Sequence, residues 1–348
     1  MPLRFRAGSL LLFVIDYNAA LWLRFFFVFA ARKSPMEDYE HSEVYNLRQR
    51  VGTRAIAWFD SQLITWSPSY DRDEPNELSQ TALAEIALLV LTLQRRCTRQ
   101  FDRHPSLKLW LDYLFKSYSR PGFHQYIFHG HRLAFIGHLI IWLTLSRNHY
   151  RLPVSREQIQ RLVAGGDRTS IVARPLYRVM ELRYFLDIGR FRHDLPSWGS
   201  LFRTGSSFAF LDLPGVEPLD IYAVTHTIFY LTDFGRHIPR FIPPDTLSRL
   251  NNSLQDLIIR MIHQHHWDLL AELLLAVHCI SSNLTQVLGA GWRELAQAQD
   301  KSGAINEGPS ASASYFGSEL GEGFLPLYHR SLTAAMAAFL GRSRTLPV

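Results

Sequence analysis

One helix-like segment carries three polar side chains whose types suit proton-transfer chemistry. His226, Tyr230 and Asp233 stand at i, i+4 and i+7 among Ile, Phe and Leu residues. On a 3.6-residue period these three side chains share one helix face. Because a buried polar group without a partner costs about 1–3 kcal/mol, the stripe must either be paired inside the core or face a cavity. We therefore expect His226 to act as an acid or base, or to bind a polar ligand group, with Asp233 orienting it.

A structural role is the alternative for the same three residues. His226 and Tyr230 would then bond to neighbouring carbonyl groups in the core. Asp233 would cap the next segment, and Gly235 would take the left-handed conformation after the helix. The tripeptide Asp233-Phe234-Gly235 also occurs in protein kinases, but the chain has no glycine-rich loop or catalytic-loop asparagine to accompany it, so a kinase is excluded.

Three further polar residues stand in apolar helical segments and complete the candidate site: Glu181, His278 and His329. Glu181 can pair with Arg178 at i, i+3, and such pairs are most often surface bridges. Several histidines and carboxylates without a nucleophile motif favour acid–base chemistry. The His263 and His266 spacing would allow a shared metal, but both lie near a helix end, where the helix dipole favours histidine by itself. We expect no metal and no cofactor, since phosphate-binding glycine loops are also missing.

The elements that must position these residues are helices. Apolar residues recur with a 3.6-residue period through most of the chain after residue 40, and no segment alternates as a strand would. About eleven or twelve helices in successive pairs predict an all-α fold, namely an α/α toroid, with an irregular α-solenoid as the alternative. The Gly-, Pro- and Ser-rich residues 188–217 and the residues 301–326 would form loops at the rim of a central funnel.

The sequence predicts two parts, an apolar N-terminal extension over residues 1–35 and a single helical domain over residues 36–348. Residues 8–30 are apolar and long enough to span a bilayer, but Asp16 and Arg24 lie inside this run and are costly in a membrane. Met36 precedes an acidic, soluble-looking start. The segment is therefore an apolar extension, a membrane anchor or the product of a mis-assigned start, and we expect it to be dispensable for folding.

Composition limits the partners. The net charge is +6, from 37 Lys and Arg against 31 Asp and Glu, but the basic residues are scattered, which argues against nucleic-acid binding. The two cysteines, Cys97 and Cys279, lie in apolar segments without metal-ligand spacing, which is typical of free thiols in a reducing cytoplasm.

The pattern Thr-His-x-x-Phe-Tyr-x-Thr-Asp-Phe-Gly at residues 225–235 and the pattern Tyr-His-x-x-Leu-x-x-x-Met-Ala from Tyr328 resemble a bacterial, actinobacterial-type family of unknown function. The resemblance covers roughly residues 45–340 and implies no established activity. Two functions follow from the residues themselves. The first is an enzyme or binder that holds a small molecule in a central funnel. The second is a non-catalytic module that binds a peptide or partner protein from a biosynthetic or signalling gene cluster. Oligomeric state is not predicted.

Overall fold

The protein is described by a computed structural model. The described residues are 35–65, 77–96, 104–120, 122–123, 126–129, 132–166, 169–170, 174–204, 215–306 and 324–340. The chain divides into two compact units, Met1–Asn46 and Leu47–Val348. In the first unit the described residues are 35–46, and all of them are helical. The proposed apolar anchor at residues 8–30 lies outside the described residues.

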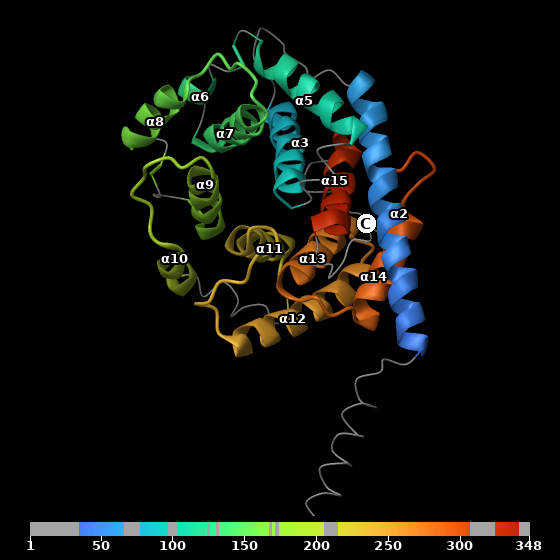
Figure 1. Cartoon of the computed structure of the whole chain (residues 1–348). Helices are drawn as coiled ribbons and strands as arrows, with labels where there is room; N and C mark the ends of the chain where they lie inside the picture. Colours follow the sequence, from blue (N-terminus) through green and yellow to red (C-terminus); the bar gives the residue numbers. More distant parts are fainter. Residues whose placement is uncertain are drawn as a thin grey trace, which may run out of the picture. The chain divides into compact units, whose positions relative to one another are not determined.

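All regular elements in the described ranges are helices, which confirms the all-α prediction; the only β-type pairing there is an isolated bridge between Gln299 and Ile305. The helices can be followed by label in Figure 1: α2 (Pro35–Thr65), α3 (Glu77–Arg96), α5 (Pro105–Tyr118), α6 (Tyr126–His129), α7 (Arg132–Arg147), α8 (Arg156–Ala164), α9 (Leu176–Ile188), α10 (Trp198–Thr204), α11 (Pro218–Thr232), α12 (Pro244–His263), α13 (Trp267–Ile280), α14 (Gln286–Ala298) and α15 (Phe324–Leu340).

Local capping explains where several helices begin. Ser155 and Gln158 form a reciprocal capping box at the start of α8, so two backbone N–H groups that the helix itself leaves unpaired are satisfied. The Thr285 hydroxyl accepts from the Leu288 N–H at the start of α14. Proline occupies the first turn of α5, α11 and α12, where its missing N–H costs nothing.

Within the second unit, six helices pack in a closed order. Helix α3 packs on α7, α7 on α9, α9 on α11, α11 on α13, α13 on α15, and α15 packs back on α3. Among these six helices, α13 has all residues except Asp268 buried. Helices α5, α6, α10, α12 and α14 pack on members of this set. The polar residues of the six helices are therefore surrounded mainly by other helices.

Two sequence-based boundaries were wrong. The expected loop over residues 188–217 contains helix α10, and α15 begins at Phe324, inside the expected loop over residues 301–326. The stretch from residue 301 begins with a packed turn. In this turn Asp300 Oδ1 accepts from Ser302 N and Gly303 N, while Ile305 is buried. Residues 307–323 lie outside the described residues. In the parts of the chain that the structure covers, no helix has the length and apolar character needed to span a membrane.

We predict that Gly303→Ala destabilises the protein by about 2–4 kcal/mol. Gly303 has φ +103°, and a Cβ there would lie 2.3 Å from the Arg54 carbonyl oxygen of α2. Gly215→Ala is the matched control, because its φ is also positive (+94°) but no atom lies within 4 Å of the added Cβ. Urea denaturation should give a loss of only about 1 kcal/mol for the control. Equal losses would show that residue 303 does not pack against α2.

Candidate functional site

A cluster of polar side chains forms where α3, α9, α11, α13 and α15 meet. It consists of Glu85, Arg178, Glu181, Tyr222, Thr225, His226, Tyr230, Asp268, Glu272 and His329. Asp268, Glu272, Arg178, Glu181 and His329 come from the first two turns of their helices. Helix N-termini carry partial positive charge, which lowers the cost of placing carboxylates there.

His329 lies at the centre of this cluster, between three carboxyl groups. Its Nδ1 atom is 2.7 Å from Asp268 Oδ1, and its Nε2 atom is 3.9 Å from both Glu85 Oε1 and Glu272 Oε1. Burial alone would lower the pKa of His329, but Asp268 and Glu85 outweigh burial and raise it to about 10. His329 is therefore an imidazolium ion at neutral pH. The His329 cation in turn holds the pKa of the Asp268 carboxyl below its usual value, because its charge and hydrogen bond outweigh the increase that burial would cause.

The other two carboxyl groups are shifted in the opposite direction. Burial raises the pKa of Glu272 to about 8, helped by the negative charge of Asp268, so Glu272 carries a proton at neutral pH. Its Oε2 atom accepts a hydrogen bond from the Thr225 hydroxyl. Burial also raises the pKa of Glu85. The Glu85 side chain is 24% exposed and that of Glu272 only 1%, so Glu85 is the more accessible of these two residues, although its Oε2 atom is buried.

His226 is a neutral imidazole with one defined tautomer. Its Nδ1 atom is 2.8 Å from the Tyr222 carbonyl oxygen, which can only accept, so Nδ1 carries the proton and Nε2 is free to accept one. Burial and the nearby Arg178 cation lower the pKa of His226 to about 4. The side chain is 24% exposed, and Nδ1 is 3.6 Å from Glu272 Oε2. His226 therefore has the protonation state and the access of a general base at pH 7.

Arg178 and Glu181 flank this base. Arg178 Nη1 lies 2.8 Å from Glu181 Oε2, and Tyr230 donates its hydroxyl proton to Glu181 Oε1 at 2.9 Å. Glu181 raises the pKa of Arg178 still further, so the guanidinium is permanently charged. The Arg178 side chain is 38% exposed, which leaves part of it open to an anionic group.

Asp233 is not part of the cluster that contains His226. Helix α11 ends at Thr232, and Asp233 itself takes the left-handed conformation at φ +50°, followed by Phe234 and Gly235 with positive φ. Its carboxylate is 2.6 Å from Arg95 Nη2 and 2.8 Å from Arg236 Nη1, and it accepts the Tyr184 hydroxyl at 2.6 Å. Hydrogen bonds and these two cations outweigh burial and lower the pKa of Asp233. These contacts tie the end of α11 to α3 and α9.

Asp233→Asn should therefore act on stability. We expect a loss of about 1–3 kcal/mol at pH 7, because two arginines lose a charged partner. The lowered pKa means that this stabilisation is present above the ordinary value of 3.8 and is lost as pH falls through the lower native value. Urea denaturation at pH 7 and pH 3 should show the difference shrinking in acid. The exposed Asp112, paired with Lys108, is the control, and Asp112→Asn should cost under about 1 kcal/mol.

His278 also lies apart from the cluster. Its Nε2 atom accepts from Trp292 Nε1 at 3.2 Å, and the two rings stack with their centroids 6.0 Å apart. Burial and Arg48 hold the pKa of His278 far below its usual value, so it is neutral. Of the six residues chosen from the sequence, the structure thus brings together Glu181, His226, Tyr230 and His329.

The sequence-based site residues did not include Glu85, Asp268 or Glu272. Glu85 and Glu272 are single carboxylates in apolar helices, and the reasoning applied to Glu181 would have selected them. Asp268 is the second residue of α13, where an acidic side chain is common for local electrostatic reasons, so nothing in the sequence marked it. In the described parts of the chain no group of three or more His, Cys, Asp or Glu residues could hold a metal ion.

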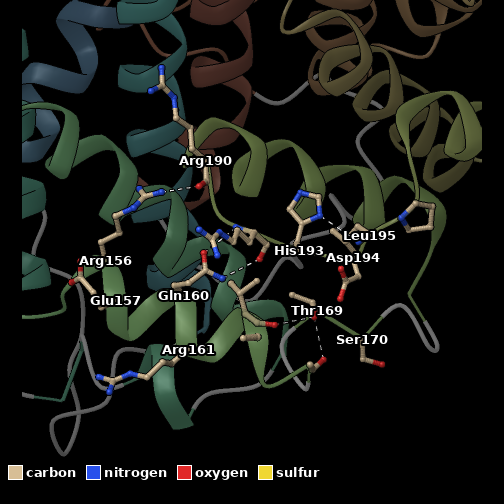
Figure 2. A pocket seen from close by; sticks show the side chains of 15 residues that line it. Arg156, Glu157, Gln160, Arg161, Thr169, Ser170, Arg190, His193, Asp194 and Leu195 are labelled. Carbon is tan, nitrogen blue, oxygen red and sulfur yellow. Dashed lines mark hydrogen bonds between the residues drawn. The ribbon is translucent and has the colours of Figure 1, made fainter.

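Two hollows are lined largely by residues outside the cluster. The larger, of about 1190 Å³, is formed by α8 and residues 190–196 (Figure 2). There Gln160 and Arg192 exchange hydrogen bonds of 2.9 and 3.0 Å between side chain and backbone, which holds the extended segment against α8. The smaller, of about 640 Å³, is lined by residues that include Arg95, Tyr230 and Asp233.

The fold and the cluster define an all-α protein with a buried histidine–carboxylate centre. Residues 52–339 match the family described as a domain of unknown function, DUF6895, and the chain belongs to that family. The match agrees with the expectation of a family of unknown function. Its extent, residues 52–339, is close to the residues 45–340 over which the resemblance was expected. No curated protein and no solved structure matches the chain.

Proposed function

We propose that the protein is an enzyme that transfers protons to and from a small polar molecule, with His226 as general base and Glu85 as general acid. The observation that carries this proposal is the opposed pKa shifts of two partly exposed groups. The pKa of His226 is lowered to about 4 and that of Glu85 is raised. Such opposed shifts separate a base from an acid at one pH.

The buried residues supply positioning for these two groups. Glu85 Oε1 lies 3.9 Å from His329 Nε2, His329 lies 3.9 Å from Glu272 Oε1, and Glu272 Oε2 lies 3.6 Å from His226 Nδ1. A continuous set of polar groups thus connects the acid to the base through a fixed cation. His329 and Glu272 act as positioning residues, since they set the charge and orientation of the groups that contact substrate.

Arg178 adds a charged anchor beside the base. Its guanidinium is half-buried, permanently charged and close enough to depress the pKa of His226. A substrate with a carboxylate or phosphate on Arg178 would place a neighbouring proton near His226 Nε2. Holding a substrate in this way contributes to catalysis by orientation.

The closed packing order of α3, α7, α9, α11, α13 and α15 supports an α/α toroid with this site at its centre. We also propose that the protein is bacterial, which the family resemblance supports, and cytoplasmic, which is supported by a buried Cys279 that forms no disulfide within the described residues. The cluster supports a small-molecule ligand in preference to a peptide or partner protein.

The test compares metabolite extracts incubated with the wild type, with His226→Gln and with Glu85→Gln, followed by untargeted mass spectrometry. We expect at least one small molecule to be consumed by the wild type and spared by both variants, while circular dichroism shows all three proteins folded. Consumption that is unchanged in the variants, or no consumption at all, would contradict the proposal and favour a non-catalytic interaction module.

A further inference from the structure

The smaller hollow, which shares Tyr230 with the cluster around His329, has the residues of a ligand site. Its volume is about 640 Å³, within the usual range for small-molecule pockets. It lies at the C-terminal ends of α3, α7, α9 and α11 and is lined by five aromatic residues, Trp142, Tyr184, Trp198, Tyr230 and Phe241, and four arginines, Arg95, Arg147, Arg156 and Arg190. We call it the arginine cavity.

The two carboxylates of the arginine cavity are already paired. Asp233 is bound by Arg95, Arg236 and Tyr184. Asp187 accepts from Trp198 Nε1 at 2.9 Å, lies 3.3 Å from Arg183 Nε and contacts His193. By contrast, Arg147, Arg156 and Arg190 form no ion pair with any residue in the described ranges. The cavity therefore holds an excess of positive charge, which an anion would neutralise.

The positions of two of these arginines are locally unfavourable. Arg156 is the first residue of α8, where the positive end of the helix dipole disfavours a cation. Arg190 follows the end of α9 with φ +52°, a conformation that favours glycine. Arg147, at the C-terminal end of α7, is favoured by the helix dipole and by itself would mean little. The helix dipole thus accounts for Arg147, and Arg156 is held by contacts with the segment after α9, since its guanidinium also lies 4.6 Å from the centre of the Phe191 ring. Among these three arginines, the position of Arg190 is the one that these local effects do not explain.

Side-chain directions agree with this assignment. Arg156 donates from Nη2 to the Arg190 carbonyl oxygen at 2.7 Å, so the two residues are fixed to each other. Arg156 and Arg190 line both hollows, and Figure 2 shows the Arg190 side chain extending away from Gln160 and Thr169 of the larger one. Its guanidinium is therefore available to the arginine cavity.

We propose that the arginine cavity binds a small organic anion that carries a phosphate group on an aromatic ring. The three arginines without carboxylate partners suit a doubly charged group, which guanidinium binds through charge-assisted hydrogen bonds. The aromatic walls suit a flat ring. The site is distinct from the proposed proton-transfer centre, although Tyr230 belongs to both.

The test is calorimetric titration of the full-length protein with phenyl phosphate, with inorganic phosphate and phenol as the two half-ligands. We expect phenyl phosphate to bind more tightly than either half-ligand, and less tightly as salt is raised. Arg147→Ala and Arg190→Gly should each weaken binding roughly ten- to hundredfold. Arg190→Gly should not lower the melting temperature, because glycine adopts this backbone conformation without strain.

His149→Gly is the matched control for the backbone change. His149 follows the end of α7 with φ +62° and does not line the arginine cavity, so binding should be unchanged. His226→Gln should also leave binding unchanged, which separates this proposal from the proposed enzyme. Three results would each overturn the proposal. The first is no binding of phenyl phosphate at 10 mM, which is roughly the weakest affinity that we would call a site. The others are equally tight binding of inorganic phosphate, and wild-type affinity for phenyl phosphate in both arginine variants.

Discussion

Replacing His329 with glutamine is expected to lower the free energy of unfolding by about 3–5 kcal/mol at pH 7, out of a typical total of ~5–15 kcal/mol. His329 is the cation to which Asp268 is bound at 2.7 Å, and two further carboxyl groups lie 3.9 Å from it. Glutamine leaves the Asp268 carboxylate buried without a charged partner. Urea denaturation followed by circular dichroism measures the loss.

Glu272→Gln is the matched control, because it changes a carboxyl in the same cluster that already carries its proton at pH 7. The raised pKa of Glu272 contributes stability that is fully present below the ordinary value of 4.5 and is lost as pH rises towards about 8. Between pH 5 and 8 the wild type should therefore lose stability relative to Glu272→Gln, by up to about 1.4 kcal/mol per pH unit. If His329→Gln were as stable as the wild type, the buried ion pair would not exist.

His226→Gln is expected to lower turnover of the molecule found by the metabolite comparison by about 10²–10⁴-fold, the usual contribution of a general base. Its stability should change little, because the ring is neutral and partly exposed. Turnover by the wild type should rise with pH through about 4, where His226 loses its second proton. It should fall again at the raised pKa of Glu85, where the acid loses its proton.

His278→Gln is the control for this prediction. His278 is also a neutral histidine, but it is fully buried and contacts Trp292 and not the cluster. It should cost stability and leave the turnover of the folded protein unchanged. Loss of turnover in His278→Gln but not in His226→Gln would reject His226 as the base.

Much of the fold followed from local sequence patterns. The 3.6-residue apolar period identified the buried helices, and Ser155, which is followed by an acidic first turn, predicted the start of α8, where the structure places it as the capping residue. Helix α10 was missed because its composition, with Gly199 and Ser200 in the first turn, resembles a loop. Whether a short segment of this kind is helical depends on packing against α9, which local pattern does not reveal.

The site was only partly predictable for the same reason. A lone polar residue in an apolar helix signals that it has a partner but does not identify the partner. Arg95 and Asp233 are 138 positions apart in the chain, and His329 and Asp268 are 61 apart. Their pairing depends on how the different helices are aligned along their axes. The apolar period within one helix does not determine that alignment. The grouping of His226 with Glu181 and His329 was accessible as a hypothesis, and so was a structural role for Asp233 at the end of its helix, but the pairing of Asp233 with Arg95 was not.

The most direct test of the proton-transfer centre is a pH titration of the two central histidines by nitrogen-15 NMR, with His226→Gln and His329→Gln used to assign the signals. We predict that His226 stays a neutral imidazole protonated at Nδ1 from pH 8 down to about pH 5, with a pKa of about 4. His329 should stay protonated on both nitrogens up to about pH 9, with a pKa of about 10. Two histidines that both titrate near 6.5 would contradict the opposed charges on which the proposed chemistry depends.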